Sequence, residues 1–425
     1  MPSISTDSWI IDFTRRSYKE EILKRGTEPH KRSLKFILRL SRSKWQVTVT
    51  FHGKLQSART ATTFAKVAKR REDLKNVCFC IDFGRIPLLD DTVTELIVSC
   101  NRGAQARRLW LKTLPDTESE YAAIADCLRL HVREDPFRVR FPLYYGDGST
   151  PTKDLSGIIK QQELSAGVHV ALIDGDEKPY IYKEVDRPLY QPRDTEVLEQ
   201  ELRNLELLRG SESVVRLISA VVSKNPYQTA ETDDDDRPIV LRGILLEHHP
   251  NGTLQDGLQA PNPKMDWPLG RWGLQITSAL FHLHHKGVTH MDLKPSNIVI
   301  STDCNAMLID ISGVGGVTQE WLAPEMRSIR DPLSQSMVSR KQNDIWALGK
   351  ILSMMASVSC NDMEKQLLRS VALDATTEAP CSRISLRDAI SKLSRFSLGW
   401  FLIKTHPSQP HRGQTRRLCD HLDGI

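Results

Sequence analysis

One short stretch of the chain, residues 290–297, combines an acid, a cation and an amide at close spacing. It reads His-Met-Asp-Leu-Lys-Pro-Ser-Asn, with the acid at Asp292, the cation at Lys294 and the amide at Asn297. The amide follows the acid by five positions, and this spacing lets Asp292 face a hydroxyl group while Asn297 turns back toward a metal ion. Such a set could support phosphoryl transfer, which depends mainly on positioning and on charge neutralisation.

Four further segments follow in a recognisable order. Asp310 opens an Asp-Ile-Ser-Gly turn after an apolar run, and residues 318–325 read Thr-Gln-Glu-Trp-Leu-Ala-Pro-Glu. Residues 344–349 read Asp-Ile-Trp-Ala-Leu-Gly. Arg383 sits where an arginine would pair with the glutamate of Ala-Pro-Glu. With residues 290–297, these motifs make the chain resemble the eukaryotic protein kinases.

The resemblance implies a role for each residue of the catalytic loop. Asp292 would orient the attacking hydroxyl and accept its proton, and Lys294 would steady the γ-phosphate. The presence of Lys294 favours Ser/Thr over Tyr in the protein substrate. Asn297 and Asp310 would hold Mg²⁺ ions that bridge the phosphates of ATP.

A lysine and a glutamate upstream complete the expected catalytic set. Lys183 ends a short apolar strand, in the place of the family's lysine that binds the α- and β-phosphates. A helix is expected from Asp194, a good N-cap, to just before Gly210. Glu201 lies inside the apolar stripe of that helix, and a carboxylate on a core face needs a partner because burying it unpaired is costly. Lys183 is the obvious partner.

The loop that would cover the phosphates departs from the family pattern Gly-x-Gly-x-x-Gly-x-Val. It appears as residues 165–172, Ser-Ala-Gly-Val-His-Val-Ala-Leu, in which only Gly167 remains of the three glycines. Side chains at Ser165 and Val170 would restrict close approach of the backbone to the phosphates. Ile181 also replaces a small residue over the adenine. Both departures predict weaker ATP binding.

The remaining adenine contacts are implied by the resemblance alone. Residues 246–249, Leu-Glu-His-His, resemble the hinge, with Leu246 as the gatekeeper. The carbonyl of Glu247 and the amide of His249 would meet the adenine edge. Leu172 and Val299 would complete the nucleotide-binding set.

Several departures bear on regulation. Met291 replaces the arginine that binds a phosphate on the family's activation loop, and only 15 positions separate Asp310 from Glu325. Activation by loop phosphorylation is therefore not expected. Ser312 replaces the hinge-like glycine of Asp-Phe-Gly, although the glycines at 313, 315 and 316 could supply flexibility.

The expected fold class is α+β: a bilobal kinase-like fold preceded by a separate, small α+β N-terminal domain. The expected boundaries are 1–145 for the N-terminal domain, 146–154 for a linker, 155–248 for the N-lobe, 249–395 for the C-lobe and 396–425 for a basic flexible tail. Only 39 positions separate Asp344 from Arg383, so the helices that dock protein substrates in the family should be abbreviated.

Hydrophobic periodicity predicts the elements of the N-terminal domain, to which the sequence assigns no activity. Strands are expected at 34–40 and 45–51, a helix at 58–71 and a buried strand at 77–83. Helices are expected near 90–99 and 118–130, followed by a last strand at 137–143.

Composition restricts the partners. The net charge is +5, yet residues 1–72 hold 17 Lys and Arg against 6 Asp and Glu. This excess allows a nucleic-acid or acidic-surface contact, but the charges interleave with apolar positions, which favours a solvated basic face. The sequence contains no apolar run of about 18 residues, so a membrane span is not expected. Scattered cysteines without a Cys-x-x-Cys pair favour a cytoplasmic location, with the nucleus as the alternative.

Three functions fit these observations. The first is an active, divergent Ser/Thr protein kinase. The second is a pseudokinase-like nucleotide-binding scaffold, which the eroded glycine loop and Ile181 would explain. The third is a small-molecule phosphotransferase, which would explain the abbreviated C-lobe but conflicts with the well-kept Ala-Pro-Glu at 323–325.

Overall fold

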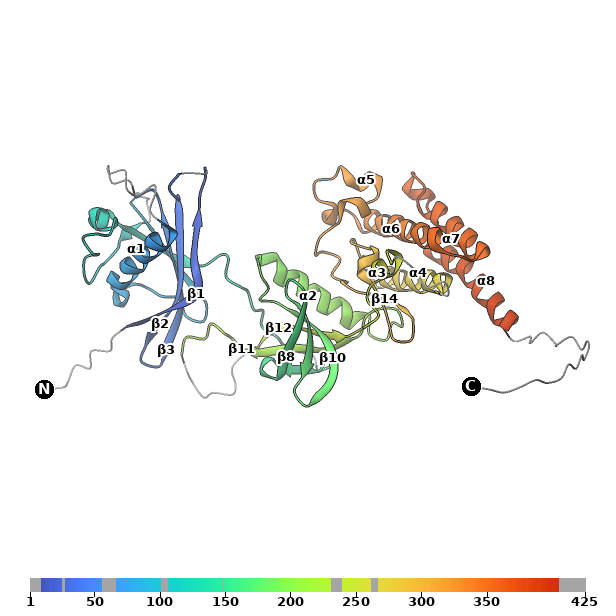
Figure 1. Ribbon diagram of the computed structural model, residues 1–425, viewed down its shortest axis with the longest axis horizontal. Helices are drawn as coiled ribbons and strands as arrows, with labels where there is room; N and C mark the ends of the chain where they lie inside the picture. Colours follow the sequence, from blue (N-terminus) through green and yellow to red (C-terminus); the bar gives the residue numbers. More distant parts are fainter. Residues whose placement is uncertain are drawn as a thin grey trace, which may run out of the picture. The chain divides into compact units, whose positions relative to one another are not determined.

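The computed structural model describes residues 9–24, 27–55, 66–100, 106–146, 148–230, 239–260 and 267–404. The fold is mixed α+β, as the sequence predicts, with two six-stranded sheets and a helical part (Figure 1). The chain divides into two compact units, one of residues 1–198 and 218–246 and the other of residues 199–217 and 247–425.

The first sheet comes from the N-terminal part of the chain, and its strands lie in the order β1-β2-β3-β4-β6-β5. They are β1 (Ile10–Glu21), β2 (Lys31–Leu40), β3 (Ser43–His52), β4 (Val93–Ser99), β5 (Arg107–Arg108) and β6 (Arg129–Glu134). The predicted strands at 34–40 and 45–51 are confirmed as β2 and β3, which pair antiparallel from Lys31↔His52 to Leu40↔Ser43. Strand β4 is parallel to β3, and the connection between them contains helix α1 (Val67–Cys80).

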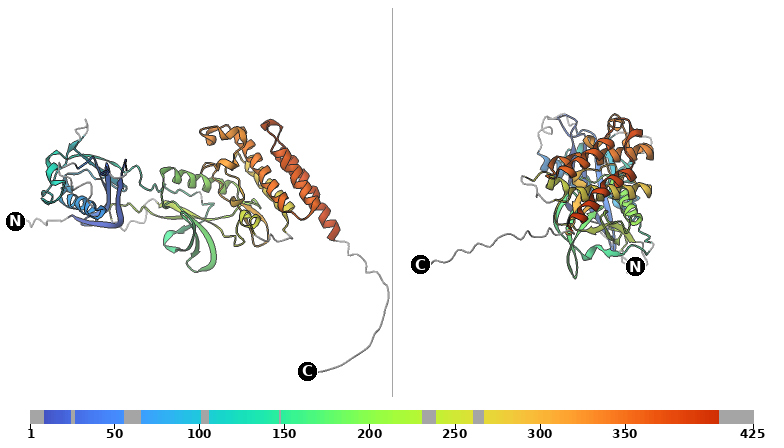
Figure 2. Two further views of the ribbon diagram at one scale, coloured as in Figure 1. Left: turned by 45° about the horizontal axis from the view of Figure 1, so that its top comes forward. Right: turned by 90° about the vertical axis from the view of Figure 1, so that its right-hand side faces the viewer.

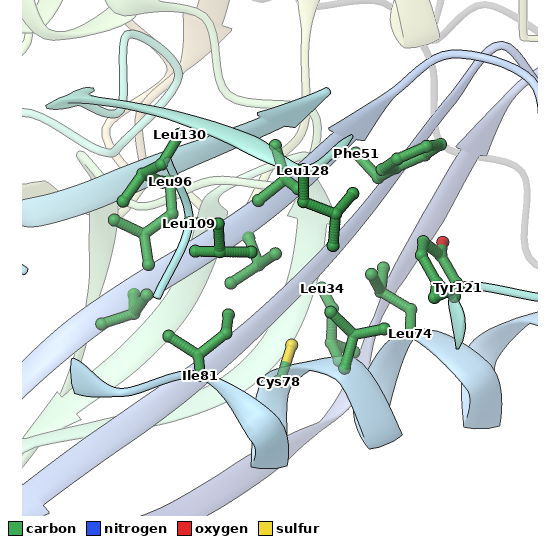
Figure 3. Packing of buried hydrophobic residues seen from close by; sticks show 14 of the residues in the cluster. Leu34, Phe51, Leu74, Cys78, Ile81, Leu96, Leu109, Tyr121, Leu128 and Leu130 are labelled. Atoms are coloured by element: carbon green, nitrogen blue, oxygen red, sulfur yellow. The ribbon is translucent and has the colours of Figure 1, made fainter. Parts of the chain in front are cut away.

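Helix α1 covers one face of this sheet and closes its core (Figure 3). Leu74, Cys78 and Ile81 recur at helical spacing and point toward the sheet residues Leu34 and Leu96. The predicted strand at 77–83 is therefore wrong, because its apolar run belongs to the last turn of a helix and the residues just after it. The predicted helix at 58–71 overlaps only the start of α1, and residues 58–65 lie outside the described residues.

Three other predictions for this part are wrong. Residues 93–99, expected within a helix, form the central strand β4 between β3 and β6. Residues 118–130, also expected as a helix, hold only the short 3₁₀ turn η3 (Ala122–Cys127) before β6 begins. Residues 137–143 form no strand and contribute one isolated bridge, Leu143↔Val240. For β4, pairing with the distant strands β3 and β6 overrides local propensity.

The second sheet has the strand order β7-β11-β12-β10-β9-β8. Its strands are β7 (Thr152–Asp154), β8 (Ile158–Ser165), β9 (Val168–Ile173), β10 (Asp176–Glu184), β11 (Leu217–Lys224) and β12 (Ile239–Glu247). Helix α2 (Pro192–Leu207) follows β10. It begins two residues before the expected cap, and the carboxylate of Asp194 accepts the backbone N–H of Gln191 at 2.8 Å.

Residues 140–144 run along this sheet and the start of α2. Backbone hydrogen bonds join Leu241 N–H to Pro142 O at 2.8 Å and Tyr144 N–H to Ile239 O at 3.0 Å. The hydroxyl of Thr195, in the first turn of α2, donates to the carbonyl of Arg140 at 2.8 Å. This segment therefore continues the hydrogen bonding of β12 and holds the first turn of the helix.

The loop between β11 and β12 is bonded to a tight turn of the N-terminal part. The backbone N–H of Thr229 donates to the carboxylate of Asp91 at 2.9 Å, and the N–H of Asp91 donates to the Thr229 hydroxyl at 2.8 Å. Asn225 donates to the carbonyl of Asp91 at 2.9 Å. Asp91 has a φ of +57°, so these reciprocal bonds hold a backbone conformation that non-glycine residues rarely adopt.

The second unit is mainly helical. Its elements are α3 (Leu254–Leu258), α4 (Leu269–His285), β13 (Ile298–Ile300), β14 (Ala306–Leu308), α5 (Pro324–Arg327), α6 (Met337–Val358), α7 (Asp362–Ala375) and α8 (Leu386–Lys404). Helix α6 packs along α7, and α4 packs along α8 (Figure 2). Helix α8 continues eight residues past the expected start of the tail at 396, and residues 405–425 lie outside the described part. Within the described residues, none of the helices has the length and apolar character needed to cross a membrane.

The predicted pair of Arg383 with the glutamate of Ala-Pro-Glu is confirmed. Both guanidinium Nη atoms of Arg383 donate to the two carboxylate oxygens of Glu325, at 2.6 and 2.8 Å. Arg383 is buried, and it also donates to the carbonyls of Gln342 and Thr377. Only α7 and a single 3₁₀ turn separate α6 from Arg383.

We expect Arg383→Ala to lower the free energy of unfolding by about 3 kcal/mol, because it leaves Glu325 without its buried partner. Burial alone would raise the pKa of Glu325, but hydrogen bonds from Arg383 hold that pKa below its ordinary value. The stabilisation is therefore present at neutral pH and is lost as the pH falls through the lowered pKa. Urea denaturation at neutral and acidic pH should show the difference from the wild type shrinking in acid.

Lys392→Ala is the matched control, because Lys392 pairs with Asp374 in the same unit but both side chains are exposed. It should change the free energy of unfolding by less than about 1 kcal/mol. Equal losses in the two variants would contradict a special role for the buried pair.

Candidate active site

The carboxylate of Asp292 is held by three neighbours. Its Oδ1 accepts the backbone N–H of Thr318 at 3.0 Å, and its Oδ2 forms an ion pair with Lys294 Nζ at 2.7 Å. Asn297 Nδ2 donates to the Asp292 carbonyl at 2.8 Å and to Oδ2 at 3.3 Å. Lys294 Nζ also donates to the Thr318 hydroxyl at 2.9 Å. The structure thus brings Asp292, Lys294 and Asn297 together, and it leaves the Asp292 carboxylate partly exposed to solvent.

Helix α6 anchors this loop through one buried acid. Asp344 is fully buried, and its carboxylate accepts the backbone N–H groups of His290 and Met291, each at 2.8 Å. Met291 has a φ of +66°, a conformation that costs free energy and persists only where the surroundings enforce it. The residue before the acid is therefore fixed in place, and Asp292 with it.

The two predicted metal ligands flank a short β-hairpin. Asn297 directly precedes β13, and Asp310 closely follows β14. Antiparallel pairing of Ile298 with Leu308 brings both to the same end of the hairpin. The N–H of Ile309 donates to the carbonyl of Asn297 at 3.1 Å, which confirms this proximity in the backbone.

These two residues fit a magnesium ion bound with a nucleotide. Both bonds of the Asn297 amide nitrogen go to Asp292, so its oxygen remains available as a ligand. Asp310 is exposed and has a φ of +59°. Mg²⁺ commonly takes one or two protein oxygen ligands and completes its shell with phosphates and water. Among the described residues, no cluster of three or more His, Cys, Asp or Glu side chains offers a self-sufficient metal site.

Ser312 closes the turn after Asp310 instead of loosening it. Its hydroxyl accepts the backbone N–H of Gly315 at 2.9 Å and of Val314 at 3.3 Å. A Cβ at Gly313 would lie 2.4 Å from the Thr289 carbonyl oxygen, so this glycine allows close packing. The segment is tightly organised at the point where the sequence suggested glycine flexibility.

One face of the second sheet carries the predicted nucleotide contacts of the first unit. Val170 pairs with Ile181, and Val168 pairs with Lys183. Cross-strand partners share a face, and alternate residues along a strand do so as well. Leu172, Ile181 and Lys183 therefore share a half-buried face, while Tyr180 and Tyr182 are buried in the core on the other side.

The glycine loop is a tight β-hairpin. Ser165 pairs with Val168, which leaves Ala166 and Gly167 as a two-residue turn. Gly167 has a φ of +76°, and a Cβ there would meet the Cβ of Arg187 at 2.4 Å. Its carbonyl also accepts the N–H of Glu184 at 2.9 Å. The single retained glycine is therefore required by packing, independently of any phosphate.

Glu201 is buried in α2, with 4% of the residue exposed, as its place in the apolar stripe predicts. Its expected partner, Lys183, is half-buried at the end of β10. The two residues belong to different compact units, and their pairing stays a prediction.

The predicted hinge residues lie at and after the end of β12. Leu246 is buried, whereas Glu247 and His249 are half-buried. Burial lowers the pKa of the neighbouring His248, so its imidazole is neutral at physiological pH. Val299 is half-buried in β13 and forms an isolated bridge with Thr253. The adenine contacts of this set stay predictions.

Comparison with known proteins agrees with this geometry. The protein kinase domain family matches residues 165–377, which is half of the chain. The chain belongs to the protein kinase family. It is 28% identical over 137 residues to mitogen-activated protein kinase kinase kinase 17 of Arabidopsis thaliana, a match covering 31% of this chain and 37% of that protein.

Other protein kinases also match part of the chain. Identity to the Aurora kinase of Candida glabrata is 29% over 185 residues, or 39% of this chain and 49% of the relative. Identity to the serine/threonine-protein kinase cds1 of Schizosaccharomyces pombe is 32% over 128 residues, or 27% of this chain and 28% of the relative. The matches thus span less than half the length of each of these relatives.

Sequence reasoning missed three contributors to the kinase site. Thr318 was identified only as part of a motif, and its bonds to Asp292 and Lys294 were not foreseen. Asp344 was identified only as the start of a buried helix. Asn204, a buried amide on α2 that donates to the backbone carbonyls of Ile311 and Ser312 just after Asp310, was overlooked altogether. Its position three residues after Glu201, on the same helix face, was the available signal.

We expect Gly167→Ala to destabilise the β8–β9 hairpin and to raise the KM for ATP, because the new methyl group would collide with Arg187. Gly175→Ala is a matched control: Gly175 has a φ of +79°, yet a Cβ there would meet open space. The control should lose only the conformational cost of about 1 kcal/mol. Thermal melts and ATP titrations that show the same change in both variants would contradict this reading.

Proposed function

We propose that this protein kinase transfers the γ-phosphoryl group of ATP, with Mg²⁺, to Ser or Thr hydroxyls of protein substrates. The observation that carries the proposal is the state of Asp292. Its carboxylate is half-exposed and oriented by Lys294, Thr318 and Asn297, which is how a positioned base must stand to receive a hydroxyl proton. The family match and the names of the Ser/Thr kinase relatives support the same reaction class.

Each residue has a physical task in this proposal. Asp292 would accept the hydrogen bond and then the proton of the substrate hydroxyl. Lys294, 2.7 Å from that carboxylate, would place a positive charge beside the transferred group, where negative charge is spread over oxygens. Asn297 and Asp310 would hold Mg²⁺, whose charge would neutralise the phosphates. Lys183, oriented by Glu201, would bind the α- and β-phosphates.

The nucleotide-binding scaffold is the second candidate. The tight hairpin at 165–168 favours it, because packing alone accounts for Gly167 and the other glycines of the family pattern are missing. A small-molecule phosphotransferase gains support from the short stretch between α6 and Arg383. Both alternatives would be separated from the proposal by turnover on protein substrates.

We expect Asp292→Asn to lower kcat by about 10²–10⁴-fold, because the amide cannot accept the hydroxyl proton. Lys183→Met should abolish transfer with an unchanged thermal melt. Glu201→Gln should be milder, because in the predicted pair a glutamine could still accept a hydrogen bond from the lysine. The assay is transfer of labelled phosphate from ATP with Mg²⁺ to the chain itself and to generic protein substrates.

Asp303→Asn is the control for the acid, because Asp303 is an exposed aspartate in the turn between β13 and β14. It should keep wild-type activity. Equal activity of wild type, Asp292→Asn and Lys183→Met would refute the catalytic proposal, and ATP binding without turnover would favour the scaffold.

Activity should not depend on phosphorylation of the segment between Asp310 and Glu325. Met291, at the family's phosphate-binding position, is buried in an apolar cluster with Leu322, Ala323 and Met326, which offers no charge to a phosphate. Protein made in a kinase-free host should therefore be as active as phosphorylated protein. A large loss of activity after phosphatase treatment, mapped to Thr318 by mass spectrometry, would contradict this expectation.

A further inference from the structure

The backbone just after Asp310 takes its hydrogen bonds from side chains. Regular structure ends at β14, so the carbonyl groups that follow need other donors. Asn204 Nδ2 donates to the carbonyl of Ile311 at 2.7 Å and to that of Ser312 at 3.1 Å. Arg340 Nη2 donates to the carbonyl of Gly313 at 2.7 Å. Three consecutive carbonyls are thus bound by side chains from α2 and α6.

Both polar atoms of the Asn204 amide are hydrogen-bonded. The residue is buried, with 5% exposed, and its Oδ1 accepts a hydrogen bond from Gln200 Nε2 at 2.8 Å. The amide therefore uses both ends, and the bond from Gln200 fixes which end faces the turn. Asn204 also lies one helical turn beyond Glu201, on the same face of α2.

The Asp310 side chain depends on the backbone that Asn204 binds. Asp310 is exposed and stands at φ +59°, and the next residue, Ile311, is completely buried. A shift of the 311–312 peptide would therefore rotate the Asp310 carboxylate away from the end of the β13–β14 hairpin where Asn297 stands. Groups that orient a metal ligand in this way commonly decide metal affinity.

We propose that Asn204 is a positioning residue, which fixes the 311–312 backbone so that Asp310 presents its carboxylate to the metal ion of the metal–nucleotide complex. This inference rests on the proposed function, because it assumes that Asp310 is a metal ligand. It adds a role that the motif residues lack: the helix that carries Glu201 also sets the geometry of the metal ligand.

A purely structural role makes a different prediction. If Asn204 only satisfied buried carbonyls, its loss would lower the melting temperature without a selective effect on metal binding. If it positions Asp310, the affinity for the metal must fall more than the affinity for the metal-free nucleotide.

The test uses the full-length chain, Mn²⁺ as a probe for the divalent cation, and a non-hydrolysable ATP analogue. Electron paramagnetic resonance measures the Kd for Mn²⁺ in the presence of the analogue, and calorimetry measures the Kd for the analogue in EDTA. Asn204→Ala should raise the Kd for Mn²⁺ by about 10-fold or more, with the Kd in EDTA unchanged. Asn204→Asp, nearly equal in size, should do the same at pH 8, because an ionised carboxylate has no N–H to donate.

Leu207→Ala is the matched control on the same helix, because Leu207 is half-exposed at 48%. It should leave the Kd for Mn²⁺ at the wild-type value. Folded Asn204 variants with an unchanged Kd for Mn²⁺ would overturn the inference, and so would parallel losses of metal and metal-free nucleotide affinity. If the wild type binds the analogue but no Mn²⁺, the proposed function is overturned as well. If the wild type binds Mn²⁺ and the Asn204 variants bind it equally well, only the inference about Asn204 is overturned.

Discussion

The buried carboxylate of Asp344 is the interaction on which the catalytic geometry depends. An ionised side chain with no exposed surface is costly unless donors surround it. Two backbone N–H groups at 2.8 Å and the imidazole of His284 at 2.9 Å meet that requirement. Because these bonds come from the catalytic loop, the backbone at Met291 must adopt a left-handed conformation where the loop passes Asp344. The orientation of Asp292 is therefore set by a helix residue that lies outside the set expected to touch substrate.

The sequence predicted the catalytic loop well because its residues are neighbours, so that spacing alone limits where their side chains point. The pair of Arg383 and Glu325 was predicted across 58 positions, since a family resemblance carries long-range contacts that periodicity cannot. Residues that act through the backbone were not predicted. Nothing in the type of Asn204 reveals that two carbonyls lie opposite it, because those carbonyls belong to a turn more than 100 positions away.

The N-terminal sheet shows where local pattern fails. Strands β2 and β3 were predicted because apolar and polar side chains alternate along each of them. Burial follows that alternation in β2, whereas residues 47–51 of β3 are buried on both faces. The apolar run after Leu74 is compatible with a strand and with a helix. In the structure it ends helix α1, and the buried residues recur at helical spacing, namely Leu74, Val77, Cys78 and Ile81. Strand β4 is paired on both sides, so its form depends on β3 and β6. The residues of the candidate active site were thus more predictable than the secondary structure of the N-terminal sheet.

The segment at 140–144 and strand β7 change what counts as the catalytic domain. The match to the protein kinase domain family begins at residue 165, yet β7 and all but the last residue of β8 lie before that point and belong to the second sheet. Arg140 receives a bond from the first turn of α2, and Asp91 exchanges bonds with Thr229. The segment that could be exchanged between genes as one folding unit is therefore longer than the region that matches the kinase family. Any recombination point between residue 91 and residue 165 would separate hydrogen-bonded partners, so the N-terminal sheet and the kinase sheet should be inherited together.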